Sequence, residues 1–178
     1  MLDLLFFIQG YAIDGLFAVS ITLMLAENTS LANAAIGGGV LLALRHVGEA
    51  LAAPLFGSLG DRFGAVKIFT MSAALTVVGL LLIAFNQVIS GAIILLIFRG
   101  AIASLGPTII AKQFGDTETV LDNLARLQSW RDIGAAAGPM VTGFALVYIS
   151  AEIQHLVLAI IFGVVLVLSS PKITTNSN

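Results

Sequence analysis

Five ionisable side chains stand inside long apolar stretches of this sequence: Asp14, Arg45, His46, Glu49 and Arg99. A charged Asp, Lys or Arg at the centre of a bilayer costs about 2.5–3.5 kcal/mol on insertion scales, so it rarely persists without a partner or a water-filled cavity. Asp14 and Arg99 lie near the middle of their stretches. They are expected either to contact a solute or a proton, or to form a buried pair that only holds two helices together.

Arg45 and Glu49 are four residues apart, so they share one side of a helix and are predicted to pair with each other. His46 and Glu49 have a spacing that can bring two metal ligands together. A catalytic zinc needs three protein ligands, however, and the only other histidine is His155. We therefore expect no metal site and no cofactor, and we expect His46 to be packed or to face a cavity. No nucleophile–base set appears, so an enzyme is not expected.

The composition requires a membrane environment. Of the 178 residues, 58% are hydrophobic and only 10% are charged, with a mean hydropathy of +1.05. Soluble domains carry about 25% charged residues, so this chain has too few charges to cover a soluble surface. The net charge of −2 argues against a nucleic-acid partner. The absence of cysteine excludes disulfides and thiol chemistry.

A helix needs about 20 mostly apolar residues to cross the hydrocarbon core. By that rule the sequence predicts six membrane spans, at about 4–26, 34–56, 66–85, 88–111, 132–149 and 153–168. The stretch between the fourth and fifth spans, 112–131, is polar. Within it, Leu121, Leu124 and Leu127 predict either an amphipathic helix on the membrane surface or a solvated connector. Residues 171–178 are predicted to be a disordered tail.

The basic residues predict the orientation of the spans. Apart from Arg45 and Arg99, all of them fall in the second–third loop, the fourth–fifth stretch or the tail: Arg62, Lys67, Lys112, Arg126, Arg131 and Lys172. The positive-inside rule places these segments and both termini in the cytoplasm. The sequence therefore predicts a multi-pass cell-membrane protein, such as one of a bacterial inner membrane.

A glycine-rich turn with one acid and two bases separates the second and third apolar stretches. Glycine lets helix ends approach closely and permits φ > 0. The pattern G-x-L-x-D-R-x-G, with a basic residue after it, resembles the loop signature of the major facilitator superfamily of transporters. The residues that carry this resemblance are Gly57, Leu59, Asp61, Arg62, Gly64 and Lys67. The sequence departs from the family at Ala65 and Val66, where two basic residues are usual.

The resemblance implies an all-α integral membrane fold of six transmembrane helices, arranged as two inverted three-helix repeats. It implies transport of a small solute by alternating access, of which proton-coupled efflux is one form. In this fold the first and fourth helices line the central cavity, so Asp14 and Arg99 are expected to contact the substrate or a coupling proton. The glycine-rich loop is expected to latch the helix ends, with Asp61 facing the N-terminus of a neighbouring helix. Arg45 and Glu49 are alternatively expected to contact a partner half.

A second motif contains Gly134, Gly138, Pro139 and Gly143. Small residues at every fourth position let a neighbouring helix pack closely, and the proline removes one helical hydrogen bond and permits a bend. The motif resembles the fifth-helix signature of many antiporters of the superfamily, except that Phe144 replaces the last glycine. Tight packing without a transport role explains it equally.

A full transporter of this family has two halves with the substrate held between them, so the predicted bundle at residues 1–170 supplies half of a cavity. We expect it to lie in a lipid bilayer, to bind a small-molecule substrate, and to pair with a second six-helix half or with a second copy of itself. The departure at Ala65 and Val66 favours the C-terminal half. Two other classes stay open: a six-helix scaffold or assembly subunit that does not transport, and a membrane enzyme.

Overall fold

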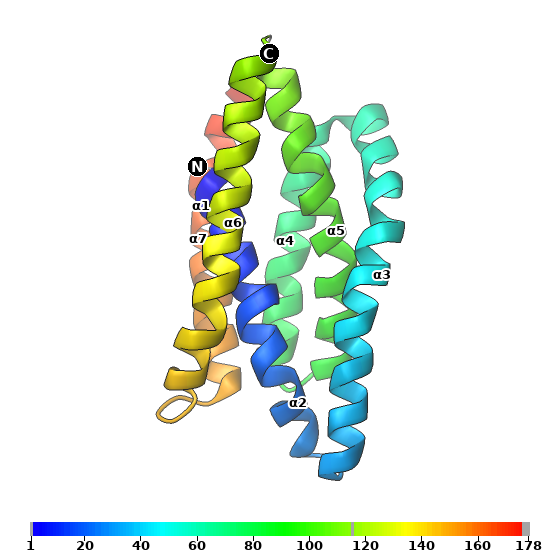
Figure 1. Cartoon of the computed structure of the whole chain (residues 1–178), viewed down its shortest axis with the longest axis vertical. Helices are drawn as coiled ribbons and strands as arrows, with labels where there is room; N and C mark the ends of the chain where they lie inside the picture. Colours follow the sequence, from blue (N-terminus) through cyan, green and yellow to red (C-terminus); the bar gives the residue numbers. More distant parts are fainter. Residues whose placement is uncertain (1, 115, 176–178) are drawn as a thin grey trace.

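The computed structural model describes residues 2–114 and 116–175, which form six antiparallel helical rods and no strand (Figure 1). The first rod is continuous but changes its winding twice. The elements in chain order are α1 (Leu2–Gln9), the π-helix η1 (Gly10–Phe17), α2 (Ala18–Ala26), α3 (Leu31–Phe63), α4 (Ala65–Ala84), α5 (Val88–Gln113), α6 (Thr117–Ala145) and α7 (Ala151–Thr175).

Five of these rods are long and apolar enough to cross a membrane: Leu2–Ala26, Leu31–Phe63, Ala65–Ala84, Val88–Gln113 and Ala151–Ser169. The sixth rod, α6, has 29 residues and runs beside the first rod, but its N-terminal half is polar. Helices suit a bilayer because they satisfy every backbone hydrogen bond internally. The all-helical membrane fold predicted from the sequence is confirmed.

Short polar caps separate the rods. Ser30 accepts a hydrogen bond from the Asn33 backbone N–H (3.3 Å) and starts α3, and Asp116 accepts one from the Thr119 N–H (2.8 Å) and starts α6. Asn86, with φ of 62°, turns the chain between α4 and α5. Gly64, with φ of 96°, is the only residue between α3 and α4. A side chain there would be strained, so glycine is required at this turn.

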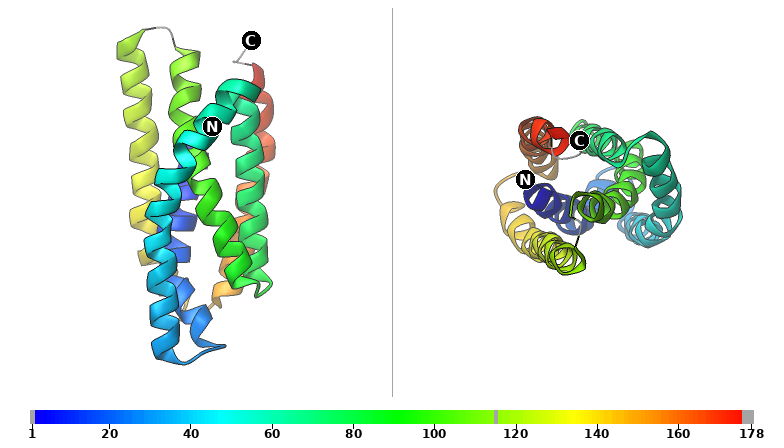
Figure 2. Two further views of the ribbon diagram at one scale, coloured as in Figure 1. Left: turned by 90° about the vertical axis from the view of Figure 1, so that its right-hand side faces the viewer. Right: turned by 90° about the horizontal axis from the view of Figure 1, so that it is seen from above.

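The packing of the rods has an internal symmetry. The first rod packs against α6, and α5 packs against α3; α4 packs against both α5 and α7, while α7 also touches the first rod (Figures 1 and 2). Exchanging the first three rods for the last three reproduces this pattern of neighbours. Because consecutive rods are antiparallel, the two groups have opposite orientations. This is the arrangement of two inverted three-helix repeats.

Three predicted boundaries were wrong. The glycine-rich segment 57–63 is helical and forms the last two turns of α3, so the loop consists of Gly64 alone. The polar stretch after the fourth span is neither a separate surface helix nor a connector, because α6 runs unbroken from Thr117 to Ala145. The predicted disordered tail starts inside α7, which continues to Thr175; residues 176–178 lie outside the described residues.

Candidate functional site

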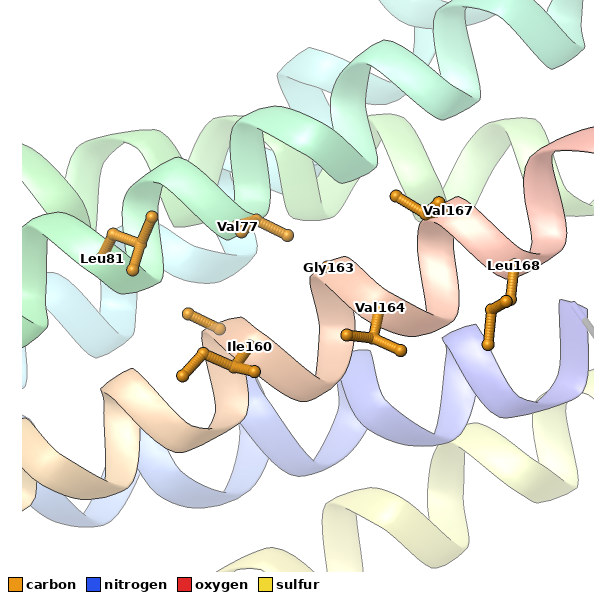
Figure 3. Close-up of a pocket in the computed structure, with 8 residues that line it drawn as sticks. Val77, Leu81, Ile160, Gly163, Val164, Val167 and Leu168 are labelled. Atoms are coloured by element: carbon orange, nitrogen blue, oxygen red, sulfur yellow. The ribbon is translucent and has the colours of Figure 1, made fainter.

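An open groove between α4 and α7 is the first place to look for a binding site (Figure 3). It has a volume of about 400 Å³, and its lining is wholly apolar, with Val77 and Leu81 on one side and Ile160, Gly163 and Val167 on the other. Such a surface offers no hydrogen bond to a polar solute. It lies between two membrane-spanning helices, so we assign it to the lipid-facing exterior.

The polar centre lies on the other side of the bundle and is built on η1. In a π-helix the hydrogen bonds run from i to i+5, and such segments appear mostly as short insertions within α-helices, frequently at functional sites. Gly10 and Gly15 fall in this segment, and so does Asp14. The extra residue in the winding changes the direction in which Asp14 points, relative to a regular helix.

Glycines hold η1 against α6 with backbone-to-backbone contact. A Cβ added to Gly138 would collide with the Cα of Gly15, and one added to Gly134 would collide with the carbonyl oxygen of Phe7. This is the close approach that small residues allow between membrane helices. Gly143 takes no part in it, because no described atom comes within 4 Å of a Cβ placed there. Pro139 is exposed.

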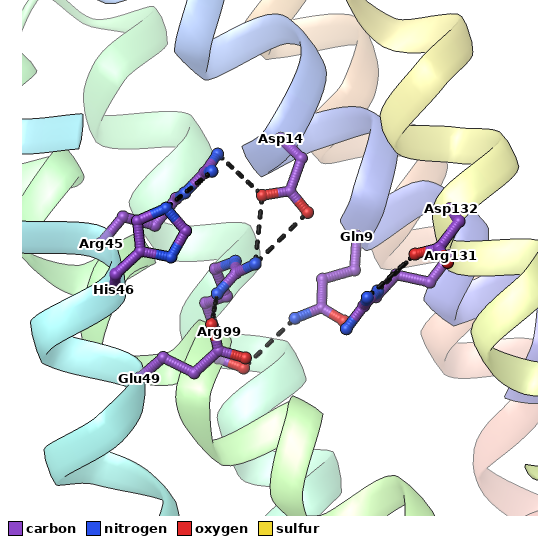
Figure 4. Close-up of polar contacts among 8 residues, drawn as sticks. All are labelled: Gln9, Asp14, Arg45, His46, Glu49, Arg99, Arg131 and Asp132. Atoms are coloured by element: carbon purple, nitrogen blue, oxygen red, sulfur yellow. Dashed lines mark hydrogen bonds and ion pairs between the residues drawn. The ribbon is translucent and has the colours of Figure 1, made fainter. Parts of the chain in front are cut away.

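Four charged side chains from three rods meet in one cluster (Figure 4). Asp14 of η1 binds Nη1 of Arg45 on α3 at 2.9 Å and Nη2 of Arg99 on α5 at 3.2 Å. Arg99 also binds Glu49 of α3 through its Nη1. The two arginines and two carboxylates balance to zero net charge. We name these four residues the charge cluster.

The predicted pairing of Arg45 with Glu49 is therefore wrong in the described structure. Each of them binds a residue on another rod instead, because Asp14 and Arg99 lie opposite α3 and offer the opposite charges. The predicted meeting of Asp14 and Arg99 does occur, but it is one side of a larger network. Sequence spacing alone identified the charged residues and could not assign their partners.

The charge cluster is open on one side. The exposed fraction of the side chain rises from 9% at Arg99 through 15% at Asp14 and 19% at Arg45 to 30% at Glu49. Arg99 is thus the buried anchor, and Glu49 lies nearest the opening. A small charged or polar solute entering from this side would meet Glu49 and Arg45 first.

Two further polar residues extend the cluster. The Gln9 side-chain amide donates to the Arg99 backbone carbonyl at 3.3 Å, while its own carbonyl oxygen is buried without a hydrogen-bond partner among the described residues. His46 lies with Nε2 3.3 Å from Nη2 of Arg45. Sequence reasoning missed Gln9, although a glutamine within an apolar stretch was a usable signal.

A second polar pair was placed wrongly from the sequence. Arg131 was assigned to a cytoplasmic connector and Asp132 to the start of a span, but both lie 14–15 residues into α6, roughly 21 Å from its first residue at 1.5 Å per residue. Arg131 binds its neighbour Asp132 at 2.9 Å. The contact between Gly10 and the Arg131 backbone places this pair beside η1.

The latch motif lies at the end of α3. Asp61 binds Nζ of Lys112, in the last turn of α5, at 3.2 Å, so these two helix ends are joined. The resemblance implied a helix N-terminus as the partner of Asp61, whereas Lys112 lies at a helix C-terminus. The Arg62 guanidinium stacks on the Phe63 ring, 5.1 Å from its centroid.

The other residues of the latch motif have simpler surroundings. Gly60 is buried against Leu105 of α5. Leu59 is 36% exposed, and Lys67 is exposed in the first turn of α4. A Cβ at Gly57 would have no described atom within 4 Å. One face of the motif therefore packs on the bundle, while the other stays open.

No group of three or more His, Cys, Asp or Glu side chains that could hold a metal ion occurs among residues 2–114 and 116–175. Glu49 beside His46 is committed to Arg99. His155 lies at the start of α7, fully buried, with Nδ1 donating to the Ala151 carbonyl at 2.8 Å. Its position matches a packed histidine better than a ligand.

The fold and the cluster together define a polytopic membrane protein with interacting charges inside its spans, a feature found along the substrate and ion pathways of membrane proteins. The family model of the Major Facilitator Superfamily matches residues 2–176. The chain belongs to this superfamily, whose members are transporters rather than enzymes. Comparison with curated proteins and with solved structures gave no match.

Proposed function

We propose that this chain is one half of a secondary transporter that moves a small solute across the cell membrane by alternating access. The observation that carries the proposal is the charge cluster, which joins three rods of both repeats through ion pairs inside the membrane. Intramembrane charges are costly and are retained mostly for substrate or ion pathways. Members of the superfamily supply the expectation of transport.

The cluster can couple binding to movement because its partners are exchangeable. Asp14 bridges two arginines, and Arg99 bridges two carboxylates. A charged group on a solute, or a proton on a carboxylate, replaces one partner and weakens the link between two rods. A ligand shifts a conformational equilibrium only through such differential interactions.

A second unit would complete the cavity. The face of α3 that carries Gly39, Ala43, His46, Ala50 and Gly57 is exposed or half-buried along its whole length and consists of small residues around one histidine. Small residues let membrane helices approach closely. We propose that this face meets a second six-helix half or a second copy of this chain, with the cluster enclosed between the two.

The orientation and the latch belong to the same proposal. The basic side chains of Arg62, Lys67 and Lys112 lie at one end of the bundle, and the loops 27–30, 85–87 and 146–150 at the other end contain none. We propose that the basic end is cytoplasmic. The Asp61–Lys112 pair would then hold the cytoplasmic ends of α3 and α5 together and open during the conformational change.

The chain itself offers a direct test of alternating access, because it contains no cysteine. Gly39 and Gly57 are 18 residues apart, five helical turns, so they share one face of α3, and a Cβ fits at both. We would label Gly39→Cys and Gly57→Cys separately with a membrane-impermeant thiol reagent in vesicles of known orientation. Transport predicts that conditions which raise labelling at one position lower it at the other.

The same variants test the partner and the alternative function. A disulfide between two Gly57→Cys chains indicates a homodimer. In the encoding DNA, a reading frame for six further helices immediately upstream indicates that this chain is the C-terminal half. Such a reading frame immediately downstream would contradict the C-terminal placement. The complete mutual pairing of the four charges also suits a scaffold that does not transport. Labelling rates that stay fixed under every condition would support the scaffold and refute alternating access.

A further inference from the structure

The groove between α4 and α7 is a surface on which a long apolar molecule can lie (Figure 3). Its lining contains no polar side chain, and its volume is about 400 Å³. Gly163 leaves room in it, because a Cβ placed there would meet its nearest described neighbour, Val77, only at 3.8 Å. On the α7 side, Ile160, Val164 and Val167 are each more than half exposed. A lipid acyl chain suits this surface, since both are wholly apolar and the two helices lie within the hydrocarbon core.

Lys67 is a free cation on the same helix as the groove. It is exposed in the first turn of α4. The other basic side chains that the structure describes either form ion pairs or stack on an aromatic ring: Arg45, Arg99, Lys112, Arg126, Arg131 and Arg62. Lys67 has neither kind of contact with any described residue. Its ammonium group can therefore bind an anion without breaking a contact of the bundle.

The groove runs towards Lys67. Lys67 and Leu81, which lines the groove, are fourteen residues apart, close to four helical turns, so they follow the same side of α4. Lys67 precedes Val77 by ten residues, about 15 Å along the helix. Val77 lies opposite Gly163, and α7 runs antiparallel to α4, so Leu168 lies roughly 8 Å nearer the Lys67 end. The apolar lining thus begins about 8 Å from the level of Lys67 and continues towards the middle of the membrane.

We propose that an anionic phospholipid binds here, with one acyl chain in the groove between α4 and α7 and its phosphate at Lys67. Basic residues between helices at the cytoplasmic side attract anionic headgroups. A zwitterionic lipid carries its own cation beside the phosphate, so Lys67 favours a lipid with net negative charge. This inference goes beyond the proposed transport function and takes from it only the cytoplasmic placement of the basic end.

Quenching of a fluorescent label measures which lipid occupies the site. Ala74 is exposed and lies midway between Lys67 and Leu81, and the chain contains no cysteine, so Ala74→Cys accepts a single label. We would place the labelled full chain in phosphatidylcholine nanodiscs that contain a small fraction of lipid with brominated acyl chains, either phosphatidylglycerol or phosphatidylcholine. We expect phosphatidylglycerol to bind about fivefold more tightly, as one basic residue at a membrane surface predicts. Equal quenching by the two lipids, or little quenching by both because another protein covers the groove, would overturn the proposal.

Two variants separate the headgroup from the acyl chain. Lys67→Gln should abolish the preference for phosphatidylglycerol. Gly163→Leu should fill the groove without a backbone collision and reduce the preference, although Lys67 is still present. A preference that persists in Lys67→Gln refutes the headgroup contact, and one that is unchanged in Gly163→Leu refutes the groove contact.

Each variant has a matched control. Arg126→Gln removes a cation at the same end of the bundle, but one already paired with Asp3, and Gly143→Leu adds the same side chain where no described atom lies within 4 Å of a Cβ. Both controls should keep the preference for phosphatidylglycerol. An Arg126→Gln chain that loses it as fully as Lys67→Gln would show a general effect of surface charge and overturn the site.

Inorganic phosphate distinguishes a lipid site from a simple anion site. Because the acyl chain contributes to binding, phosphate should displace the brominated lipid no more than chloride does at the same ionic strength. Stronger displacement by phosphate would overturn the proposal. The quenching needs no solute, so the lipid site and the transport function fail separately. Transport without a lipid preference refutes the site alone, whereas a lipid preference in a chain that moves no solute leaves the site standing.

Discussion

Asp14 is predicted to be the residue whose charge matters most to the stability of the bundle, because it is the one carboxylate that bridges both arginines. Replacing it with Asn preserves the size and one acceptor but leaves two arginines facing Glu49 alone. Removing one partner of a fully buried ion pair costs about 3–5 kcal/mol. Asp14 is 15% exposed and Asn still accepts a hydrogen bond, so we expect about 2–3 kcal/mol for Asp14→Asn.

Thermal unfolding of the purified chain in detergent measures this loss. For a chain of this size, 1 kcal/mol shifts Tm by about 2–4 °C, so Asp14→Asn should lower Tm by roughly 4–12 °C. The matched control is Asp3→Asn. Asp3 pairs with Arg126, whose side chain is 60% exposed, and exposed pairs contribute at most about 1 kcal/mol. The Tm of the Asp3→Asn variant should therefore shift by less than about 4 °C.

A double variant separates charge balance from local contacts. Asp14→Asn combined with Arg45→Gln leaves only Arg99 and Glu49, which balance each other. Residues that share an ion-pair network show coupling energies of about 0.5–3 kcal/mol, whereas independent sites add within about 0.5 kcal/mol. We therefore expect the double variant to be clearly more stable than the sum of the single losses predicts. Strict additivity would refute the charge cluster as an energetic unit.

Three further predictions concern helix packing, the latch and a cap. Gly138→Leu should prevent folding, because its side chain collides with the Gly15 backbone, while Gly143→Leu should fold normally; size-exclusion profiles of the two variants compare them. Asp61→Ala and Lys112→Ala should change Tm little, since both side chains are more than half exposed, but they should raise thiol labelling at the latch end. Hydrogen bonds from Thr119 hold the pKa of Asp116 below its usual 3.8. Because the pKa of Asp116 is lowered in the folded state, its carboxylate stabilises α6 at pH values above 3.8, and this stabilisation is lost as the pH falls through the lowered pKa. Amide hydrogen exchange at the start of α6, corrected for its intrinsic pH dependence, should therefore become faster in that acidic range. The Asp116→Asn variant should not show this change with pH.

Much of the fold could be predicted because a membrane imposes one rule. Runs of about 20 apolar residues must form helices, and five of the six predicted spans correspond to rods that are long and apolar enough to cross a membrane. The rule failed at α6, where charged residues interrupt the pattern: Arg131 and Asp132 neutralise each other within the helix, so the helix continues through them. Hydropathy measures each residue separately and does not include such pairing.

The sequence predicted which charged residues belong to the candidate site but not which of them form ion pairs with one another. Four of its charges were conspicuous in apolar stretches, whereas the choice between neighbours four residues apart and partners on other rods depends on packing. The π-helix at η1 determines where Asp14 points, and the Gly15–Gly138 contact determines how near α6 lies. Neither has a sequence signal beyond glycine itself, so the partners of Asp14 required the three-dimensional arrangement.

The inverted repeats explain why the polar groups gather where they do. The first rod and α5 are equivalent under the exchange of repeats, and they carry Asp14 and Arg99; α3 and α6 are likewise equivalent and carry two mid-helix charges each. The third rods, α4 and α7, line the apolar groove instead. Two equivalent rod pairs therefore carry the mid-helix charges, and one pair lines the apolar groove. The two repeats differ in how these mid-helix charges pair, because Arg45 and Glu49 of α3 bind other rods while Arg131 and Asp132 of α6 bind each other. Motion driven by exchange of ion partners should thus begin at α3, with α6 fixed to η1 by glycine contacts.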